Sequence, residues 1–182
     1  MIRRVRGPAR RSSSGFTLIE LMVTVAVIGI LAVVGVPAMA GLVNANRIVA
    51  ANDNLVSALQ LARSEAIRRG AAVTVCASAN GTTCANQTNW SRWIVRGRDN
   101  AASAAAGSDV IDIMRDETPT GDIQLQGPSG GIRFRSSGLV DAEQTLTVCM
   151  PTNYPAENQR VVTVMLGGGV RTAKASGGGS CS

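Results

Sequence analysis

The residue types that carry most enzyme chemistry are scarce in this chain. None of its 182 residues is histidine, so neither a serine–histidine nor a cysteine–histidine nucleophile can be assembled. The Gly167–Gly169 run lacks the lysine and hydroxyl of a phosphate-binding loop. The adjacent acids Asp116 and Glu117 precede Pro119 and Gly121, a context typical of a solvated turn. The sequence therefore predicts no catalytic residues, no cofactor and no enzymatic activity.

The cysteines are the remaining reactive side chains, and all four follow a long apolar segment: Cys76, Cys84, Cys149 and Cys181. An even number of cysteines in an exported domain indicates disulfides, and four cysteines allow three pairings. We favour Cys76–Cys84, which closes a short loop, and Cys149–Cys181, which ties the last residues to a strand. A zinc site is the alternative, but the chain has no C-x-x-C pair and no histidine, so no metal is expected.

The positive charge is concentrated at the N-terminus. The formal charge is +6, and the first residues hold five arginines without any acid: Arg3, Arg4, Arg6, Arg10 and Arg11. The remaining 13 basic residues are nearly balanced by 12 acidic ones, all of which lie beyond Phe16. A basic stretch ahead of an apolar run orients a membrane segment with its N-terminus in the cytoplasm. The alternative, a basic arm that binds nucleic acid, is less favoured.

An apolar segment follows the basic stretch. In residues 21–36 only Thr24 has a polar side chain, and the run from Phe16 to Val43 is long enough to cross a bilayer as a helix. Glu20 interrupts it, and a carboxylate in hydrocarbon usually marks a function or a specific partner. Residues 38–40 form an A-x-A pattern, so the alternative is a signal peptide cut after Ala40 that releases a soluble β protein.

The residues from Gly15 to Glu20 (GFTLIE) resemble the type III signal of type IV pilins and type II secretion pseudopilins. The resemblance implies a leader, residues 1–15, that a prepilin peptidase removes between Gly15 and Phe16. It further implies N-methylation of Phe16, pairing of Glu20 with the N-terminus of a neighbouring subunit during assembly, and a helix kink at Pro37. Residues 16–40 would then be the transmembrane and assembly helix.

The helical pattern resumes after Pro37 and continues to Arg69. Apolar residues recur on one face, at Ile48, Leu55, Leu59, Ala62 and Ala66. Arg68 and Arg69 followed by Gly70 are typical of a helix C-terminus. We therefore expect one helix over about residues 17–69, of which 41–70 is the amphipathic second half.

The period changes to that of strands from residue 71 onward. Strand-like runs occur at 73–75, 90–95, 110–113, 123–125, 132–135, 146–148, 161–166 and 170–174, and no helical period recurs. Residues 99–108, 151–158 and 175–180 are expected to be loops. The predicted fold class is α+β: a long N-terminal helix packed on a small, mostly antiparallel β domain, residues 71–182.

The join between helix and sheet resembles the GspH/FimT class of minor subunits. The shared features are an A-R-S-E-A helix end at residues 62–66, a V-T-V-C strand at 73–76, a second cysteine at Cys84 and a tryptophan at Trp90. The resemblance implies a structural subunit that assembles with other major or minor pilins or pseudopilins. It would sit in the bacterial inner membrane as a single-pass protein with a periplasmic C-terminal domain, and be extracted into a type IV pilus or a type II secretion pseudopilus.

DNA is the remaining candidate partner. Some FimT-like members of this class are associated with DNA uptake through a basic segment near the last strands. Here Arg160, Arg171 and Lys174 could form a small patch on the final hairpin, and contacts to phosphates would suffice for binding without sequence preference. The G-R-x-R-like element expected of such members is replaced by GVRTAK at residues 169–174.

Overall fold

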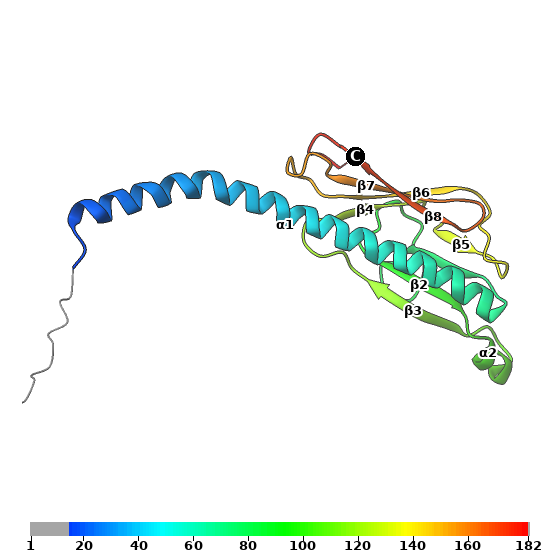
Figure 1. Cartoon of the computed structure of the whole chain (residues 1–182). Coiled ribbons are helices and arrows are strands. Elements are labelled where there is room, and N and C mark those ends of the chain that lie inside the picture. The colour runs from blue at the N-terminus through cyan, green and yellow to red at the C-terminus, as the bar shows by residue number, and fades with distance from the viewer. Residues whose placement is uncertain (1–14, 182) are drawn as a thin grey trace, which may run out of the picture. The chain divides into compact units, whose positions relative to one another are not determined.

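The computed structural model describes residues 15–181 and divides into two compact units, Met1–Met39 and Ala40–Ser182. Helix α1 (Leu18–Arg69) begins in the first unit and ends in the second (Figure 1). It starts within one residue of the predicted position and ends at the predicted one. No helix among residues 15–181 is both long and apolar enough to cross a membrane.

The part of α1 in the second unit is held by one buried stripe. Six of its apolar side chains are buried together with Asn52, and most of them lie three or four residues from the next: Ile48, Leu55, Ala58, Leu59, Ala62 and Ala66. The helix ends where Gly70 adopts a φ of 61°, a left-handed conformation that costs glycine little, and its amide donates to the carbonyl of Ile67 at 3.3 Å. The sequence therefore sets both the buried face and the end of the helix.

Two four-stranded antiparallel sheets cover this stripe. The first has the order β3-β2-β1-β5 and is formed by β1 (Val73–Ala77), β2 (Trp93–Arg98), β3 (Ile111–Glu117) and β5 (Ile132–Phe134). The second has the order β4-β6-β7-β8 and is formed by β4 (Gln124–Gln126), β6 (Gln144–Cys149), β7 (Gln159–Val164) and β8 (Val170–Ala175). The predicted α+β class, a helix packed on antiparallel sheet, is confirmed.

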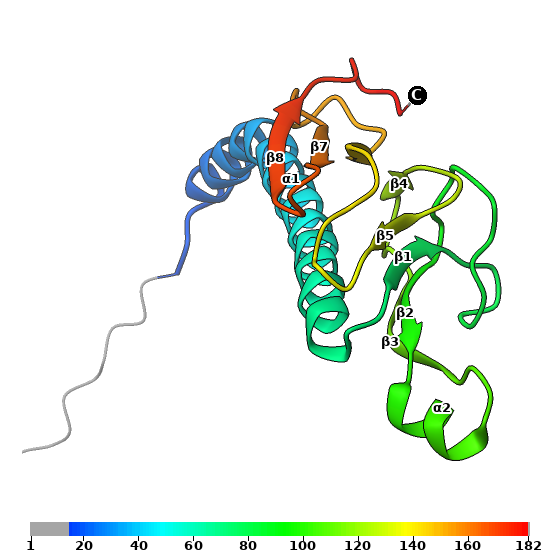
Figure 2. The same ribbon diagram turned by 90° about the vertical axis from the view of Figure 1, so that its right-hand side faces the viewer.

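One hydrophobic core joins the helix to both sheets. It contains Leu59 from α1, Val75 and Val95 from the first sheet, and Leu146 and Val162 from the second. Along β7 the residues alternate between buried and half-buried, as expected for a strand with one face against the core. Figures 1 and 2 show β8 lying alongside α1, where the Thr172 hydroxyl donates to Asn52 at 3.3 Å.

One predicted loop was wrong. Residues 99–108 were expected to lack secondary structure, but Asn100–Ala106 form a short helix, α2. The Asp99 carboxylate caps it by accepting from the amide of Ala102 at 3.0 Å, and Gly107 ends it with a φ of 67°. Alanine has the highest intrinsic helix propensity, so an alanine-rich segment between such caps forms a helix without any apolar periodicity.

Candidate functional site

The start of α1 is built by a local cap. The backbone of Gly15, Phe16 and Thr17 is not helical, and the Thr17 hydroxyl accepts from the amide of Glu20 at 3.3 Å. The Thr17 carbonyl accepts from the amide of Leu21 at 3.1 Å. Thr17 and Glu20 thus have the spacing of a capping box, and a carboxylate in the first turn is favoured by the helix dipole. This geometry places Glu20 one turn from Phe16, the predicted mature N-terminus.

The first half of α1 presents apolar side chains to its surroundings on all faces. Phe16 is 81% exposed. The other exposed large apolar residues of this stretch are Leu18, Ile19, Leu21, Met22, Val23, Val25, Val27, Ile28, Ile30, Leu31, Val33, Val36, Met39, Leu42 and Val43. A surface of this extent on a soluble monomer would be unusual, and it marks a contact with lipid or with other protein. The helix runs without interruption through Pro37, and the kink predicted there stays a prediction.

The first disulfide, Cys76–Cys84, closes a compact loop after β1. The Asn80 carboxamide oxygen accepts from the amides of Thr82 and Thr83 at 3.0 and 2.9 Å, and Gly81 has a φ of 78°. This side-chain-to-backbone pattern is a tight turn that brings the two cysteines together.

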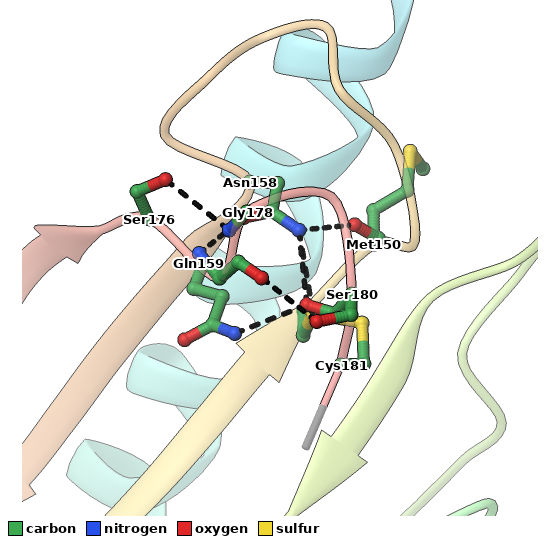
Figure 3. Close-up of a disulfide and its surroundings, with 9 residues drawn as sticks. Met150, Asn158, Gln159, Ser176, Gly178, Ser180 and Cys181 are labelled. Atoms are coloured by element: carbon green, nitrogen blue, oxygen red, sulfur yellow. Dashed lines mark hydrogen bonds between the residues drawn. A yellow bond between two sulfur atoms is a disulfide. The ribbon is translucent and has the colours of Figure 1, made fainter.

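The second disulfide, Cys149–Cys181, ties the C-terminal tail to the end of β6 (Figure 3). Asn158 is fully buried beneath the tail. Its amide nitrogen donates to the carbonyls of Met150 at 2.9 Å and Ser180 at 3.2 Å, and its oxygen accepts from the amide of Gly177 at 2.7 Å. Both disulfides are the pairings favoured from the sequence. No sequence pattern predicted that Asn158 would hold the tail in place.

An ion-pair network joins the end of α1 to β3. Glu65 accepts from Arg68 at 3.0 and 2.6 Å and from Arg69 at 2.8 Å, and Arg69 also donates to Asp112 of β3 at 2.7 Å. Hydrogen bonds from Arg68 and then from Arg69 lower the pKa of Glu65 to about 2. Glu65 of the A-R-S-E-A segment therefore holds Arg69, and Arg69 attaches the end of the helix to β3.

The three residues of the possible DNA-binding patch do not share one face. In the antiparallel register of β7 and β8, Arg160 lies opposite Lys174, whereas Arg171 lies opposite Thr163. Residues an odd number apart along a strand point to opposite faces of the sheet, so Arg171 faces away from the other two. Arg160 is buried and donates to the carbonyls of Glu157 and Gln159, and Lys174 is paired with Glu157 at 3.4 Å. The structure therefore does not assemble the predicted patch.

Comparison with known proteins identifies the family of the chain. The sequence pattern described as "Type II transport protein GspH" matches residues 51–168, well over half of the chain. The chain belongs to the GspH family. A second pattern, the prokaryotic N-terminal methylation motif, matches residues 10–36 and includes Gly15, Phe16 and Glu20. The resemblance to GspH/FimT-type minor pilins and pseudopilins is confirmed, whereas the roles of individual residues stay predictions.

This GspH-family chain is similar to solved structures of a minor pilin and a minor pseudopilin. The type IV minor pilin FimU of Pseudomonas aeruginosa is 19% identical, with a TM-score of 0.51 over 70% of this chain and 89% of FimU. The minor pseudopilin EpsH of the Vibrio cholerae type II secretion system is 18% identical, with a TM-score of 0.49 over 72% of this chain and 96% of EpsH. No curated protein matches the chain.

Proposed function

We propose that this GspH-family chain is a structural minor subunit of a type IV pilus or a type II secretion pseudopilus, without enzymatic activity. The observation that carries the proposal is the match to two patterns at once, the methylation motif over residues 10–36 and the GspH pattern over 51–168. A prepilin peptidase cuts between Gly15 and Phe16, and Phe16 is then N-methylated. The mature helix joins the filament together with other pilins or pseudopilins.

Glu20 is the residue that directs assembly in this proposal. Cleavage creates a positive amine on Phe16, and a carboxylate in an apolar environment needs such a partner, because an unpaired charge there is costly. The cap on Thr17 holds Glu20 in the first helical turn. The amine of a neighbouring subunit can neutralise Glu20 there, while the exposed apolar side chains of both helices pack together.

Before assembly, the same segment anchors the chain in the inner membrane, with residues 41–182 in the periplasm. The support is the match to the methylation motif and the sequence itself, in which Thr24 is the only polar side chain of residues 21–36. The arginines of the leader favour a cytoplasmic N-terminus.

The processing step is tested by the intact mass of the chain purified from its own host, with fragmentation of the N-terminus. The expected product begins at N-methylated Phe16. A product beginning at Gly41 would instead indicate cleavage after Ala40 and a soluble exported protein, and the proposal would be wrong.

The assembly step is tested with Glu20→Gln, which keeps the size of the side chain and removes its charge. We expect normal cleavage and methylation but a loss of incorporation into sheared filaments of tenfold or more. Thr24→Val is the matched control, because the Thr24 hydroxyl only donates to the carbonyl of Leu21 within the same helix, at 2.8 Å. Equal incorporation of the two variants would contradict the role of Glu20.

The two alternatives receive less support. The match to the methylation motif favours the cut at Gly15 over one after Ala40. A DNA-binding role would need Arg160, Arg171 and Lys174 to act together, and the register of the last hairpin separates Arg171 from the other two.

A further inference from the structure

The aromatic residues of the chain fall into two groups. Trp90, Trp93 and Phe134 are buried in the core of the β domain. The other two are among the most exposed large apolar residues described: Phe16 at 81% and Tyr154 at 69%. Phe16 stands at one end of the apolar segment. Tyr154 is more than a hundred residues away in sequence, so its exposure needs a separate explanation.

Tyr154 lies beside the other end of the apolar segment. Its loop, residues 151–158, packs on α1 at the start of the second unit. The Asn44 side chain donates to the Tyr154 carbonyl at 3.2 Å and to the Thr152 hydroxyl at 3.4 Å. The loop passes close to the helix here: a Cβ at Gly41 would lie 3.5 Å from the Cβ of Tyr154, an ordinary van der Waals contact. The loop is thereby attached to the helix at residues 41–44.

The position of this attachment matches the thickness of a bilayer. From Leu21 to Asn46 no side chain of α1 carries a charge, and Arg47 is the first charged residue after Glu20. A helix from Leu21 to Gly41 rises ~30 Å, which equals the hydrocarbon thickness of a typical bilayer. Gly41 and Asn44 would therefore lie where the helix passes from hydrocarbon to headgroups. Leu42 and Val43, between them, are exposed apolar residues.

We propose that Tyr154 and its loop rest in the headgroup layer of the inner membrane and fix the depth of the β domain before assembly. The ligand is the interface of a phospholipid bilayer. A tyrosine suits this layer because its ring is apolar and its hydroxyl polar, and tyrosine and tryptophan are enriched at both membrane surfaces. Arg47, less than one turn beyond Asn44, can extend its guanidinium toward the phosphates. The inference rests on the membrane anchoring proposed above.

The backbone hydrogen bonds of Tyr154 and the apolar residues nearby on α1 favour lipid as the environment of the Tyr154 ring. Tyr154 is the only tyrosine of the protein, and its backbone groups are already partly satisfied: its amide donates to the Thr152 hydroxyl at 3.2 Å and its carbonyl accepts from Asn44. The loop is thus fixed to the helix by its backbone, which leaves the side chain free to contact a partner. Leu42 and Val43, which lie between Gly41 and Asn44 on α1, are exposed and would extend the apolar surface covered by the membrane.

The test is tryptophan quenching with the full chain in lipid nanodiscs, one chain per disc. Tyr154→Trp places a fluorophore in the loop, and lipids brominated near the carbonyl end of their acyl chains quench it on contact. The matched control is Leu166→Trp. Leu166 is also exposed, at 58%, and belongs to the β7–β8 turn. That turn lies against Arg63, because a Cβ on Gly168 would come within 2.9 Å of the Arg63 Nε. Arg63 is ~33 Å along α1 from Gly41.

We expect the Tyr154→Trp signal to be quenched at least threefold more than that of Leu166→Trp, after subtraction of the signal of the native chain with its buried Trp90 and Trp93. Retention of the native thermal midpoint shows that each variant is folded. Equal quenching of the two variants overturns the inference.

Alkaline carbonate extraction of the native host's membranes separates the two levels of the proposal. If the chain is extracted, membrane anchoring fails and the inference fails with it. If the chain is retained but the fluorescence of the Tyr154→Trp variant is not quenched, only the inference fails, and a neighbouring subunit becomes the partner of Tyr154.

Discussion

The ion-pair network at the end of α1 makes the folding stability of the β domain depend on pH. Glu65 is held by Arg68 and Arg69, and its pKa falls from 4.5 to about 2. A carboxyl whose pKa is lower in the folded state stabilises the fold fully above its unfolded pKa, and this contribution is lost as the pH falls through the folded value. The window is therefore pH 4.5 to about 2.

The size of the effect follows from the pKa and the exposure of the partners. The lowered pKa corresponds to at most ~3 kcal/mol of folding free energy at neutral pH. The Arg68 side chain is 65% exposed, however, so solvent screens its share. The better-buried contact with Arg69 remains, and we expect about 1–2 kcal/mol from Glu65 in total.

The assay is urea unfolding of the full chain in detergent, followed by tryptophan fluorescence at about pH 6 and about pH 2.5, on either side of most of the transition. Other carboxylates also titrate in this range, so the informative quantity is the difference between the native chain and Glu65→Gln. The native chain should lose about 1–2 kcal/mol more than the variant on acidification. Ser64→Ala should behave like the native chain, because the Ser64 hydroxyl only donates to the carbonyl of Leu61 within the same helix. Equal losses for the native chain and Glu65→Gln would refute the reasoning.

The other predictions concern the disulfides and one close glycine contact. Replacing both cysteines of Cys149–Cys181 by serine should lower the free energy of unfolding by ~3.7 kcal/mol, and the same change at Cys76–Cys84 should lower it by ~2.5 kcal/mol, because the closed loops span 32 and 8 residues. Urea unfolding measures both values, and a larger loss for Cys76–Cys84 than for Cys149–Cys181 would contradict this account. Gly127→Ala should cost about 1–3 kcal/mol, because its Cβ would lie 2.7 Å from the Trp90 ring, whereas Gly130→Ala meets open space and should leave the thermal midpoint within experimental error. A Gly127 variant that melts like the Gly130 one would show that the ring moves aside.

The sequence predicts the features that depend on local pattern. The C-terminal end of α1 is predictable because Arg68, Arg69 and Gly70 mark it, and the strands are predictable because apolar and polar residues alternate. The observed strand β2 begins at Trp93, not at Trp90, because Trp90 pairs only singly: its amide donates to Leu125 of β4 at 2.8 Å. Helix α2 was missed because alanine carries no periodicity, although Asp99 and Gly107 could have indicated its two caps.

The features that depend on register could not be predicted in the same way. The separation of Arg171 from Arg160 follows from how β7 pairs with β8, and a shift of one residue would reverse it. The role of the buried Asn158 could not be predicted either, because its three hydrogen bonds connect segments that only the fold brings together. The N-cap formed by Thr17 is a different case, because the T-x-x-E spacing of residues 17–20 is present in the sequence and indicates it.

The attachment of α1 to both sheets also decides how the β domain bears mechanical load. Its buried stripe extends from Ile48 to Ala66, and polar links to other elements recur beside it, from Asn44 to Arg69. A pull on the N-terminal end of this stretch acts along the helix axis and loads these contacts in shear, all at the same time. Detaching the helix requires breaking them together, whereas a strand peeled from a sheet edge breaks its bonds one by one. Resistance to force is set by the rate of such a concerted rupture, so a domain of ordinary thermodynamic stability can withstand an axial pull.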